Sequence, residues 1–446
     1  MSISLKGNIL AALCLGALVT GCGSKVSTAD VSAGAKEVTV TSPSVESEDT
    51  SEPTEQTSEE VSEPAQEENS GEVQSETTET EEVTEETTAP EEEEQSDDPV
   101  EQKLSELSLQ DKVCQMFIVT PEQLTGYGCV TYADQAMEQA LSTYNVGGII
   151  FFAQNLSYWD QTTGLLADCQ TYSMEKNGLG LFTAVDEEGG TVARAAQKLG
   201  TTALYNMEYY GSLNDSETAY GVGTTLGRDL ASLGFNVDFA PVADVNLNPA
   251  NELGSRIFSS DPYIVSDMVS NVVMGIQDQG VCATLKHFPG LGSAGGNTHY
   301  DNYVHIYRTL DELRAAELIP FRGGIEAGAD FVMVGHQIVS GIGDELPADL
   351  SYSAVTGLLR NELGFEGLAV TDAQQMNTIS GVYGSGGAAV MSVEAGIDLI
   401  LMPADLPSAV WSVCDAVESG RITEERIDES VRRILRKKYE LGLMEE

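Results

Sequence analysis

The sequence is poor in basic side chains, with 22 Lys and Arg against 71 Asp and Glu and a formal net charge of −49. A protein this acidic repels the phosphates of nucleic acids and of anionic lipids, so both are poor candidates as partners. Cysteine is also scarce: there are seven, and no two form a C-x-x-C pair. Neither a zinc site nor a disulfide-rich scaffold is therefore implied.

Histidine is rarer still, with four residues, two of which lie in LKHFPGLGSAGGNTHY (285–300). No H-x-H or H-E-x-x-H pattern occurs, and twelve residues separate His287 from His299, so we expect no metal ion. The G-x-x-x-x-G-K-[ST] order of a phosphate-binding loop is absent as well, because Lys286 precedes the glycines. A metal site and a phosphate-binding loop are therefore both poor interpretations of this stretch, and acid–base chemistry is a third interpretation that the residues alone do not decide.

The first hundred residues lack the composition of a folded core. Residues 23–100 contain no aromatic residue and hold 25 acidic against 2 basic side chains. We predict a disordered acidic linker there, with a partner-binding acidic tail as the alternative. Residues 1–22 have one Lys, a short apolar run and the ending V-T-G-C, which resembles a lipoprotein signal peptide lipidated at Cys22. This predicts an extracytoplasmic protein anchored at the bacterial cell membrane surface; an ordinary signal peptide or an uncleaved anchor are the alternatives.

Residues 101–446 have the pattern of one large α/β domain. Apolar runs rich in Val, Ile and Phe alternate with helix-like stretches such as 266–280 and 309–328, each of which ends at a Gly. Near-continuous hydrophobicity is typical of parallel strands covered on both faces. Eight such runs predict a (β/α)8 TIM barrel, with a doubly wound open sheet as the alternative. The eight runs are 115–120, 146–153, 181–185, 235–244, 282–288, 331–336, 368–372 and 398–403.

Polar residues collect at the ends of these predicted strands. They are Asp186, Asp244, Lys286, His287, His336 and Asp372. Enzymes with this fold carry their catalytic residues at the carboxyl ends of the strands, so the pattern predicts a site there.

Single residues leave alternatives open. A carboxylate such as Asp372 suits a nucleophile, because it is ionised at neutral pH, but Asp at a strand–helix turn is equally suited to cap a helix. The DEEGG stretch (186–190) with Arg194 offers carboxylates and a base, or only a solvated turn. Arg256 has a purely structural role as its alternative, and no role is assigned to His336.

In combination, these segments resemble the catalytic barrel of family 3 glycoside hydrolases, and most closely its bacterial β-N-acetylglucosaminidase branch. The resemblance spans about residues 103–443. It is carried by DEEGGTVAR (186–194), APVADVNLNPANELGSRIF (240–258), KHFPGLG (286–292), NTH (297–299), LRNELGFEGLAVTDAQQM (359–376) and SVRRILRKKYELGL (430–443).

The resemblance implies a retaining, two-step reaction on a terminal N-acetylglucosamine, without a cofactor. Asp372 takes the position of the nucleophile and His299 that of the acid–base. The implied sugar-binding residues are Asp186, Arg194, Arg256, Lys286 and His287. Because the chain stops at the barrel's last helix, we expect the single-domain branch rather than a two-domain relative.

The chain departs from the branch at three positions. Leu291 and Ser293 replace a His and an Asp around the GLG element, and Asn297 replaces the Asp that partners the catalytic His. An Asn carbonyl can accept the ring N–H of His299, but it does not stabilise the imidazolium electrostatically. Asp301 is a candidate for the missing charge, or else an exposed loop acid.

These residues support three functional hypotheses. The first is an exo-β-N-acetylglucosaminidase acting on peptidoglycan fragments or chitooligosaccharides. The second is a phosphorylase that uses inorganic phosphate as acceptor, since a neutral acid–base repels an anion less than a Glu does. The third is a catalytically weakened surface protein that binds sugar, which Asn297, Leu291 and Ser293 motivate.

Overall fold

The computed structural model describes residues 98–295 and 304–444. Eight strands pair in parallel in the order β11-β9-β7-β6-β3-β2-β1-β12, and a bridge between Val370 and Leu399 joins the two ends of this order. The sheet therefore closes, and the predicted (β/α)8 barrel is confirmed. The strands are β1 (Phe117–Val119), β2 (Gly148–Ile150), β3 (Phe182–Val185), β6 (Val237–Asp238), β7 (Cys282–Phe288), β9 (Phe331–Val334), β11 (Leu368–Thr371) and β12 (Ile400–Leu401).

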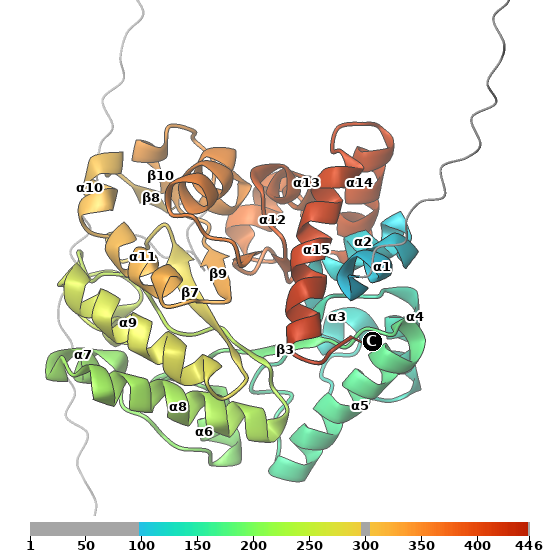
Figure 1. Cartoon of the computed structure of the whole chain (residues 1–446), viewed down its shortest axis with the longest axis horizontal. Helices are drawn as coiled ribbons and strands as arrows, with labels where there is room; N and C mark the ends of the chain where they lie inside the picture. Colours follow the sequence, from blue (N-terminus) through green and yellow to red (C-terminus); the bar gives the residue numbers. More distant parts are fainter. Residues whose placement is uncertain (1–97, 296–303, 445–446) are drawn as a thin grey trace, which may run out of the picture. The chain divides into compact units, whose positions relative to one another are not determined.

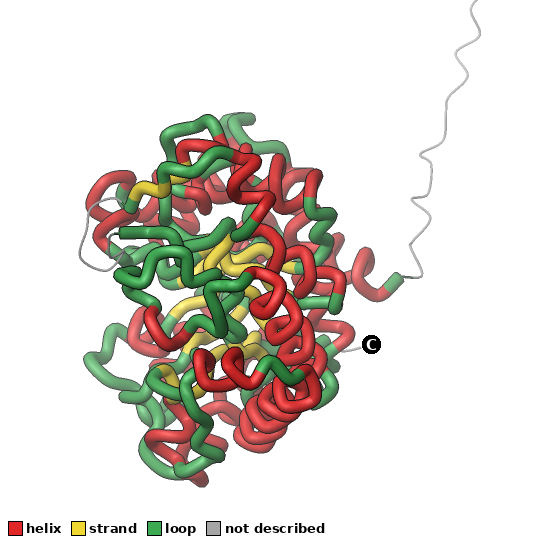
Figure 2. Tube along the Cα trace, turned by 90° about the vertical axis from the view of Figure 1, so that its left-hand side faces the viewer, coloured by secondary structure: helices red, strands yellow, loops and turns green. Residues whose placement is uncertain are grey.

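Helices cover the outside of the barrel. Figure 1 shows α8 and α9 side by side on one flank, and Figure 2 shows the strands running through the centre with helices around them. The helices are α1 (Pro99–Glu106), α2 (Leu109–Gln115), α3 (Pro121–Thr125), α4 (Gln135–Thr143), α5 (Trp159–Asn177), α6 (Arg194–Leu199), α7 (Met207–Leu213), α8 (Ser216–Leu233), α9 (Pro262–Gln277), α10 (Leu310–Ala315), α11 (Leu318–Glu326), α12 (Asn377–Tyr383), α13 (Ser385–Ala395), α14 (Leu406–Glu418) and α15 (Glu424–Glu440).

Short elements complete the fold. Two small sheets lie outside the barrel: β4 (Glu187–Gly189) pairs with β5 (Val192–Ala193), and β8 (His305–Ile306) pairs with β10 (Ile338–Val339). The remaining turns are η1 (Gly254–Arg256), η2 (Ser340–Ile342), η3 (Ala348–Leu350) and the π-helix η4 (Ser353–Glu362).

All eight predicted apolar runs contain a barrel strand. Every residue of the eight strands is buried, which accounts for hydrophobic runs that do not alternate with polar residues. Inside the barrel, the rings of Phe182 and Phe331 meet edge to face with their centroids 5.5 Å apart. The strands are shorter than the runs, because the last residues of several runs leave the sheet to form the barrel mouth.

The stretch 309–328 forms two helices, α10 and α11, where a single helix-like segment was expected. Ala316 leaves the helical conformation with φ −141° and ψ −76°. Pro320 has no amide hydrogen to donate to the carbonyl of Ala316, so a continuous helix would lose a hydrogen bond there. In α11 this proline falls in the first turn, where such donors have no partner within the helix in any case.

The folded part begins slightly earlier than the predicted boundary at residue 101. Helix α1 starts at Pro99, and the Asp98 side chain caps it by accepting a hydrogen bond from the Val100 amide at 3.0 Å. An acidic N-cap followed by Pro at the first helical position is a common start for a helix. The sequence did not reveal this start, because Asp98 and Pro99 are as typical of the acidic linker as of the beginning of a helix.

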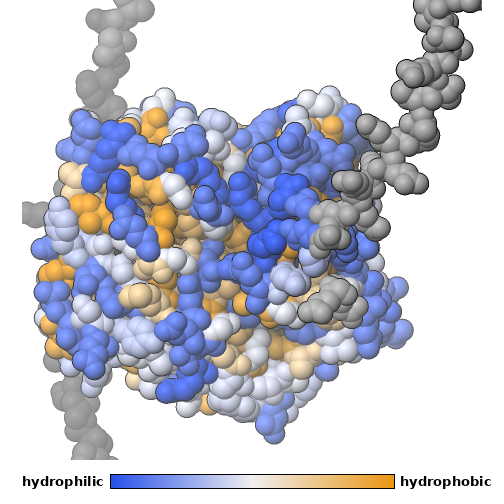
Figure 3. Space-filling model, in the orientation of Figure 1, coloured by the Kyte–Doolittle hydropathy of each residue, from blue (hydrophilic) through white to orange (hydrophobic). Residues whose placement is uncertain are grey.

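One face of the protein is largely hydrophilic, in line with the excess of acidic residues (Figure 3). On the face in Figure 3, hydrophilic residues predominate and apolar residues lie in patches between them. Among residues 98–295 and 304–444, no helix has the length and hydrophobicity that crossing a bilayer requires.

One lysine is fully buried away from the barrel mouth. Lys438 in α15 is 0% exposed, and its Nζ donates to Oε1 of Gln115 at 2.7 Å and lies 5.3 Å from the centre of the Phe182 ring. Burial lowers the pKa of Lys438 to about 7. The folded state therefore releases a proton that the unfolded chain keeps up to its usual pKa of 10.5.

Replacing Lys438 by Met is expected to raise the free energy of unfolding at pH 7 by about 2 kcal/mol, because the buried amine is removed. In the wild type the unfolded state binds more protons between pH 7 and 10.5, so stability rises with pH across that window. The variant should lack this rise. Denaturant unfolding from pH 6 to 10 measures it, with the exposed Lys176→Met as control. An unchanged slope in Lys438→Met would contradict the buried-amine assignment.

Candidate active site

A cavity of about 330 Å³ opens at the carboxyl ends of the barrel strands. This volume lies in the range of small-molecule sites. Six residues that the sequence nominated line it together: Asp186, Arg194, Arg256, Lys286, His287 and Asp372. Their side chains come from the ends of β3, β7 and β11 and from α6 and η1. The other nominated positions, Asn297, His299 and Cys22, and the candidate Asp301, lie outside the described residues.

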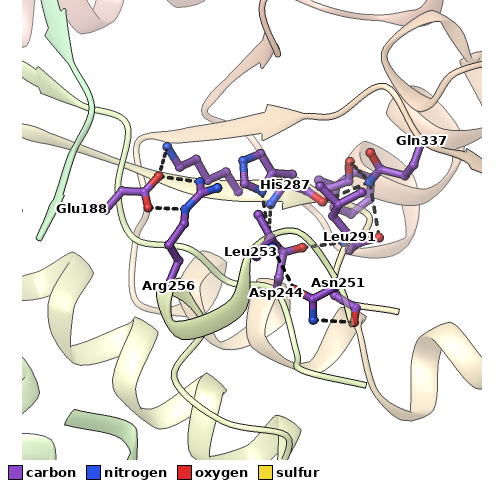
Figure 4. A network of polar contacts seen from close by, with 12 residues as sticks. Glu188, Asp244, Asn251, Leu253, Arg256, His287, Leu291 and Gln337 are labelled. Atoms are coloured by element: carbon purple, nitrogen blue, oxygen red, sulfur yellow. Dashed lines mark hydrogen bonds and ion pairs between the residues drawn. The ribbon is translucent and has the colours of Figure 1, made fainter. Parts of the chain in front are cut away.

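A buried charge network forms one wall of the cavity. Lys286 Nζ lies 2.9 Å from Oδ1 of Asp186 and 2.6 Å from Oε1 of Glu188. Arg256 meets Glu188 with two parallel hydrogen bonds of 2.7 Å, which Figure 4 shows. Burial opposes ionisation of Glu188, but Lys286 and Arg256 lower its pKa to about 2. Glu188 therefore stays ionised and holds both cations at the cavity wall.

The two glutamates of the DEEGG stretch have different roles. Glu187 is buried, and its carboxylate accepts hydrogen bonds from the amides of Ala195 and Ala196 at 2.7 and 3.0 Å, at the start of α6. Glu188 faces the cavity instead. Glu188 was not among the site residues predicted from the sequence. The DEEGG motif contained the signal, but the pairing with Arg256, 68 residues away, appears only in the fold.

Asp244 fixes the position of His287. The carboxylate of Asp244 is fully buried and accepts hydrogen bonds from the His287 amide at 3.1 Å and from the Leu291 amide at 2.5 Å. Its Oδ2 also lies 2.8 Å from Nδ1 of the His287 ring, so Asp244 orients this ring from below (Figure 4). With Nδ1 engaged by a carboxylate, Nε2 is the ring nitrogen left for a ligand. Asp244, which the sequence left unassigned, is a positioning residue.

Hydrogen bonds from Gln337 and close packing at Gly292 fix the end of β7 and the turn that follows it. Gln337 donates through Nε2 to the carbonyls of His287 and Phe288, both at 3.1 Å. Gly292 packs so tightly that a Cβ there would lie 2.0 Å from the carbonyl oxygen of Val245. Leu291, which stands where the related branch has a His, is buried and lines the cavity. The start of the Gly-rich stretch is therefore a fixed wall of the site.

Asp372 follows the last residue of β11 at the cavity floor. Its amide donates to the carbonyl of Val334 at 2.8 Å, and its Oδ1 accepts from the Ala373 amide at 2.7 Å. Burial raises the pKa of the carboxyl, but the charge of His336 and the Ala373 amide bring the pKa below its usual value. Asp372 caps no helix, since the next helix, α12, starts at Asn377 with Met376 as its N-cap. Of the two alternatives for this residue, the cap is therefore wrong.

His336 lies beneath Asp372 and is fully buried. Its Nδ1 forms a 3.1 Å ion pair with Oδ1 of Asp349, and its Nε2 donates to the carbonyl of Ala373 at 3.1 Å. Burial works against the charged ring, but Asp349 and the charge of Asp372 raise the pKa of His336 to about 9. A protonated His336 thus stabilises the ionised form of Asp372.

Replacing His336 by Gln is expected to raise the pKa of Asp372, because the nearest stabilising charge is lost. The acid limb of the kcat/KM profile should then move to higher pH, with about a tenfold loss of activity at the acid end. A pH–rate profile measures this, and Asp349→Asn removes the partner charge in a second variant. His305→Gln, outside the cavity, is the control. An acid limb that stays in place would show that His336 does not act on Asp372.

Arg194 lines the cavity and has a donor without a partner. Its Nε is buried and has no hydrogen-bond partner among the described residues. A buried N–H of this kind costs free energy unless a ligand or water accepts from it.

Within residues 98–295 and 304–444, no cluster of three or more His, Cys, Asp or Glu is arranged to hold a metal ion. The donors and carboxylates of the cavity suit a neutral ligand with many hydroxyl groups.

Comparisons with known proteins agree with this geometry. Residues 102–437 match the family described as the glycosyl hydrolase family 3 N terminal domain. Beta-hexosaminidase A of Pseudoalteromonas piscicida is 33% identical over 333 residues, which cover 68% of this chain and 55% of that protein. Beta-hexosaminidase of Stenotrophomonas maltophilia (strain K279a) is 34% identical over 263 residues, or 58% of this chain and 76% of that protein.

A solved structure extends the likeness to three dimensions. The family 3 beta-N-acetylglucosaminidase of Paenibacillus sp. str. FPU-7 superposes with a TM-score of 0.71 at 38% identity, covering 76% of this chain and 63% of that one. The chain thus spans 55% and 63% of the length of two of these relatives. With a family match over three quarters of its residues and a closed barrel that carries the family's motifs at its mouth, the chain belongs to glycosyl hydrolase family 3.

Proposed function

We propose that the protein is a retaining, exo-acting β-N-acetylglucosaminidase. The observation that carries this proposal is the ionised Asp372 in a cavity whose other walls are hydrogen-bonding side chains. The names of the relatives support it, since they are beta-hexosaminidases and a beta-N-acetylglucosaminidase. The substrate is a terminal β-linked N-acetylglucosamine on a chitooligosaccharide or a peptidoglycan fragment.

The reaction has two steps. In the first, the Asp372 carboxylate attacks C1 of the sugar while His299 donates a proton to the departing glycosidic oxygen. In the second, His299 takes a proton from water, whose oxygen attacks C1 and releases Asp372. Lys286, Asp186 and the side chain of Arg194 bind the sugar hydroxyls. Two displacements at C1 retain the anomeric configuration.

A single assay tests the activity. The expected result is release of 4-nitrophenol from 4-nitrophenyl β-N-acetylglucosaminide, with free N-acetylglucosamine as the sugar product. The assay is repeated in phosphate buffer, because a phosphorylase would form the sugar 1-phosphate there instead. Binding of N-acetylglucosamine without turnover in either buffer would favour the sugar-binding alternative and overturn the proposal.

Asn297 tests the acid–base role of His299. In this proposal Asn297 orients His299 as a neutral partner, so the imidazolium lacks a neighbouring negative charge. Asn297→Asp should supply that charge and raise the pKa of the His299 acid, which moves the basic limb of the pH–rate profile to higher pH. A pH–rate profile that is identical in wild type and variant would contradict the acid–base role of His299. Asp301→Ala distinguishes whether Asp301 already supplies the charge.

We also propose that Cys22 carries a lipid anchor and that residues 23–100 are a stalk, which places the enzyme outside the cytoplasm at the membrane surface. The sequence of the first 22 residues supports this proposal. Cys22→Ser should move the protein from the membrane fraction to the soluble fraction of cells that secrete it. Equal membrane association of both forms would contradict the lipid anchor.

A further inference from the structure

A fully buried glutamate packs against the turn that follows β7. Glu317 is the N-cap residue of α11, and its side chain is 0% exposed. It does not line the catalytic cavity, so the proposed chemistry does not use it directly. A carboxylate costs free energy to bury unless neighbouring groups favour its charge. The groups next to Glu317 therefore bear on its role.

The first neighbour is Arg308, which follows β8. Its Nε lies 2.8 Å from Oε1 of Glu317, and its side chain is 25% exposed. The contact is an ion pair rather than a well-directed hydrogen bond, because neither atom completes a hydrogen bond among the described residues. Strand β8 is itself fixed, since His305 pairs with Ile338 of β10. Glu317 thus holds the chain where it leaves β8.

The second neighbour is Ser293, in the turn after β7. Burial raises the pKa of Glu317, and both the charge of Arg308 and the hydroxyl of Ser293 work against this rise. The Oγ of Ser293 is buried and completes no other hydrogen bond within the described part of the chain. Because a hydroxyl hydrogen rotates toward the best acceptor, the Glu317 carboxylate is the group to which Ser293 donates.

The stem of the Glu317 side chain also packs against this turn. A Cβ at Gly290 would lie 2.7 Å from Cβ of Glu317, and Gly290 has a φ of +125°, so only glycine fits there. One turn further along α11, the ring of Phe321 meets that of Phe288 in β7 edge to face, with centroids 5.3 Å apart. Helix α11 and the end of β7 therefore form one packed unit.

The two polar neighbours of Glu317 bracket the proposed acid–base in the sequence. His299 lies six residues after Ser293 and nine residues before Arg308. Residues 296–303 lie outside the described part of the chain, but both flanking positions contact Glu317. A chain segment whose two ends are held at one point has fewer conformations available than a free one.

We infer that Glu317 is a positioning residue that ties both ends of the segment carrying His299 to the end of β7, and so keeps His299 within reach of the glycosidic oxygen. The inference rests on the proposed function and assigns Glu317 to the protonation step, not to the attack by Asp372. An acid must lie within hydrogen-bond reach of the atom that it protonates, and a shift of ~1 Å can cost about 10²-fold in rate.

The leaving group makes this role measurable. An alkoxide departs only when it is protonated, whereas 2,4-dinitrophenolate departs without a proton. The test therefore compares kcat/KM for methyl β-N-acetylglucosaminide with kcat/KM for 2,4-dinitrophenyl β-N-acetylglucosaminide. Glu317→Gln keeps the size of the side chain and removes its charge. It should lower kcat/KM about 10²-fold for the methyl glycoside and less than about threefold for the dinitrophenyl glycoside. Glu326→Gln, at an exposed position of the same helix, is the matched control.

Two further variants test the contacts one at a time. Ser293→Ala removes the hydroxyl with little risk to folding, and Arg308→Gln removes the paired charge. Each should lower the ratio of methyl to dinitrophenyl activity about fivefold. The matched controls are Ser142→Ala on α4 and Arg322→Gln on α11, both at exposed positions, and they should leave this ratio unchanged.

Azide gives a second readout. Azide attacks C1 of the glycosyl-enzyme without releasing a proton, so it needs no base; the ester bond to Asp372 breaks and the β-glycosyl azide forms. Added azide should therefore raise kcat of Glu317→Gln on the dinitrophenyl substrate and should have little effect on that of the wild type.

The outcomes separate the inference from the proposed function. If the wild type cleaves neither glycoside, the proposed function fails. If the wild type cleaves both, and Glu317→Gln and Ser293→Ala change the two kcat/KM values by the same factor or not at all, the positioning role of Glu317 is overturned. Should Glu317→Gln fail to fold in a thermal melt, the ratio measured for Ser293→Ala decides.

Discussion

Replacing Asp372 by Ala is expected to lower kcat for 4-nitrophenyl β-N-acetylglucosaminide by about 10⁵-fold, because the attacking carboxylate is lost. The variant should still fold, since among residues 98–295 and 304–444 the Asp372 side chain accepts one hydrogen bond, from the adjacent Ala373 amide. Its melting temperature should stay within a few degrees of the wild type. The measurement is a steady-state assay together with a thermal melt.

Chemical rescue makes this prediction specific to a nucleophile. In the smaller variant Asp372→Gly, added azide can occupy the vacated space and attack C1, giving the α-glycosyl azide with inverted configuration. Asp160→Ala, in the exposed first turn of α5, is the control and should keep full activity. Wild-type rates in Asp372→Ala would rule out Asp372 as the nucleophile.

Replacing Glu188 by Gln is expected to produce the second large effect, on both activity and stability. Glu188 is the shared anion of Lys286 and Arg256, and its side chain is 2% exposed. Without its charge, the buried Lys286 and the partly exposed Arg256 lose the anion that they share, which should cost about 3 kcal/mol of unfolding free energy. Because both cations line the cavity, kcat/KM should fall by about 10²- to 10³-fold.

The pH dependence of stability identifies this loss with Glu188. Its pKa is lowered in the folded state to about 2 from its usual value of 4.5. A lowered carboxyl pKa gives stability that is present above pH 4.5 and is lost as the pH falls toward 2. Glu188→Gln should lack this contribution, and denaturant unfolding between pH 3 and 7 measures it. The exposed Glu175→Gln on α5 should behave like the wild type. If Glu188→Gln does so too, the charge network does not stabilise the site.

The barrel could be predicted from the sequence because its strands are buried on both faces. That burial produces apolar runs such as 182–185 and 368–371 that are too short for helices and do not alternate. The break between α10 and α11 was harder to predict. Pro320 was visible, but a proline in the first turn of a new helix looks the same in sequence as one inside a continuous helix.

Much of the cavity could also be predicted, because the carboxyl ends of parallel strands meet at one end of a barrel. This rule alone brings Asp186, Lys286 and Asp372 together. The pairing of His336 with Asp349 could not be predicted, since Asp349 lies in a stretch without a recognisable motif. The choice between Glu187 and Glu188 for the cavity likewise depends on which way each side chain points from β4.

The most direct measurement of the central claim is to trap the covalent intermediate. A 5-fluoro-N-acetylglucosaminyl fluoride forms the glycosyl-enzyme faster than water releases it, so the adduct accumulates. Mass spectrometry of peptides from the inactivated enzyme should find one fluorinated N-acetylhexosamine, bound as an ester to Asp372. Turnover without any adduct, or an adduct on another carboxylate, would contradict the assignment of Asp372 as the nucleophile.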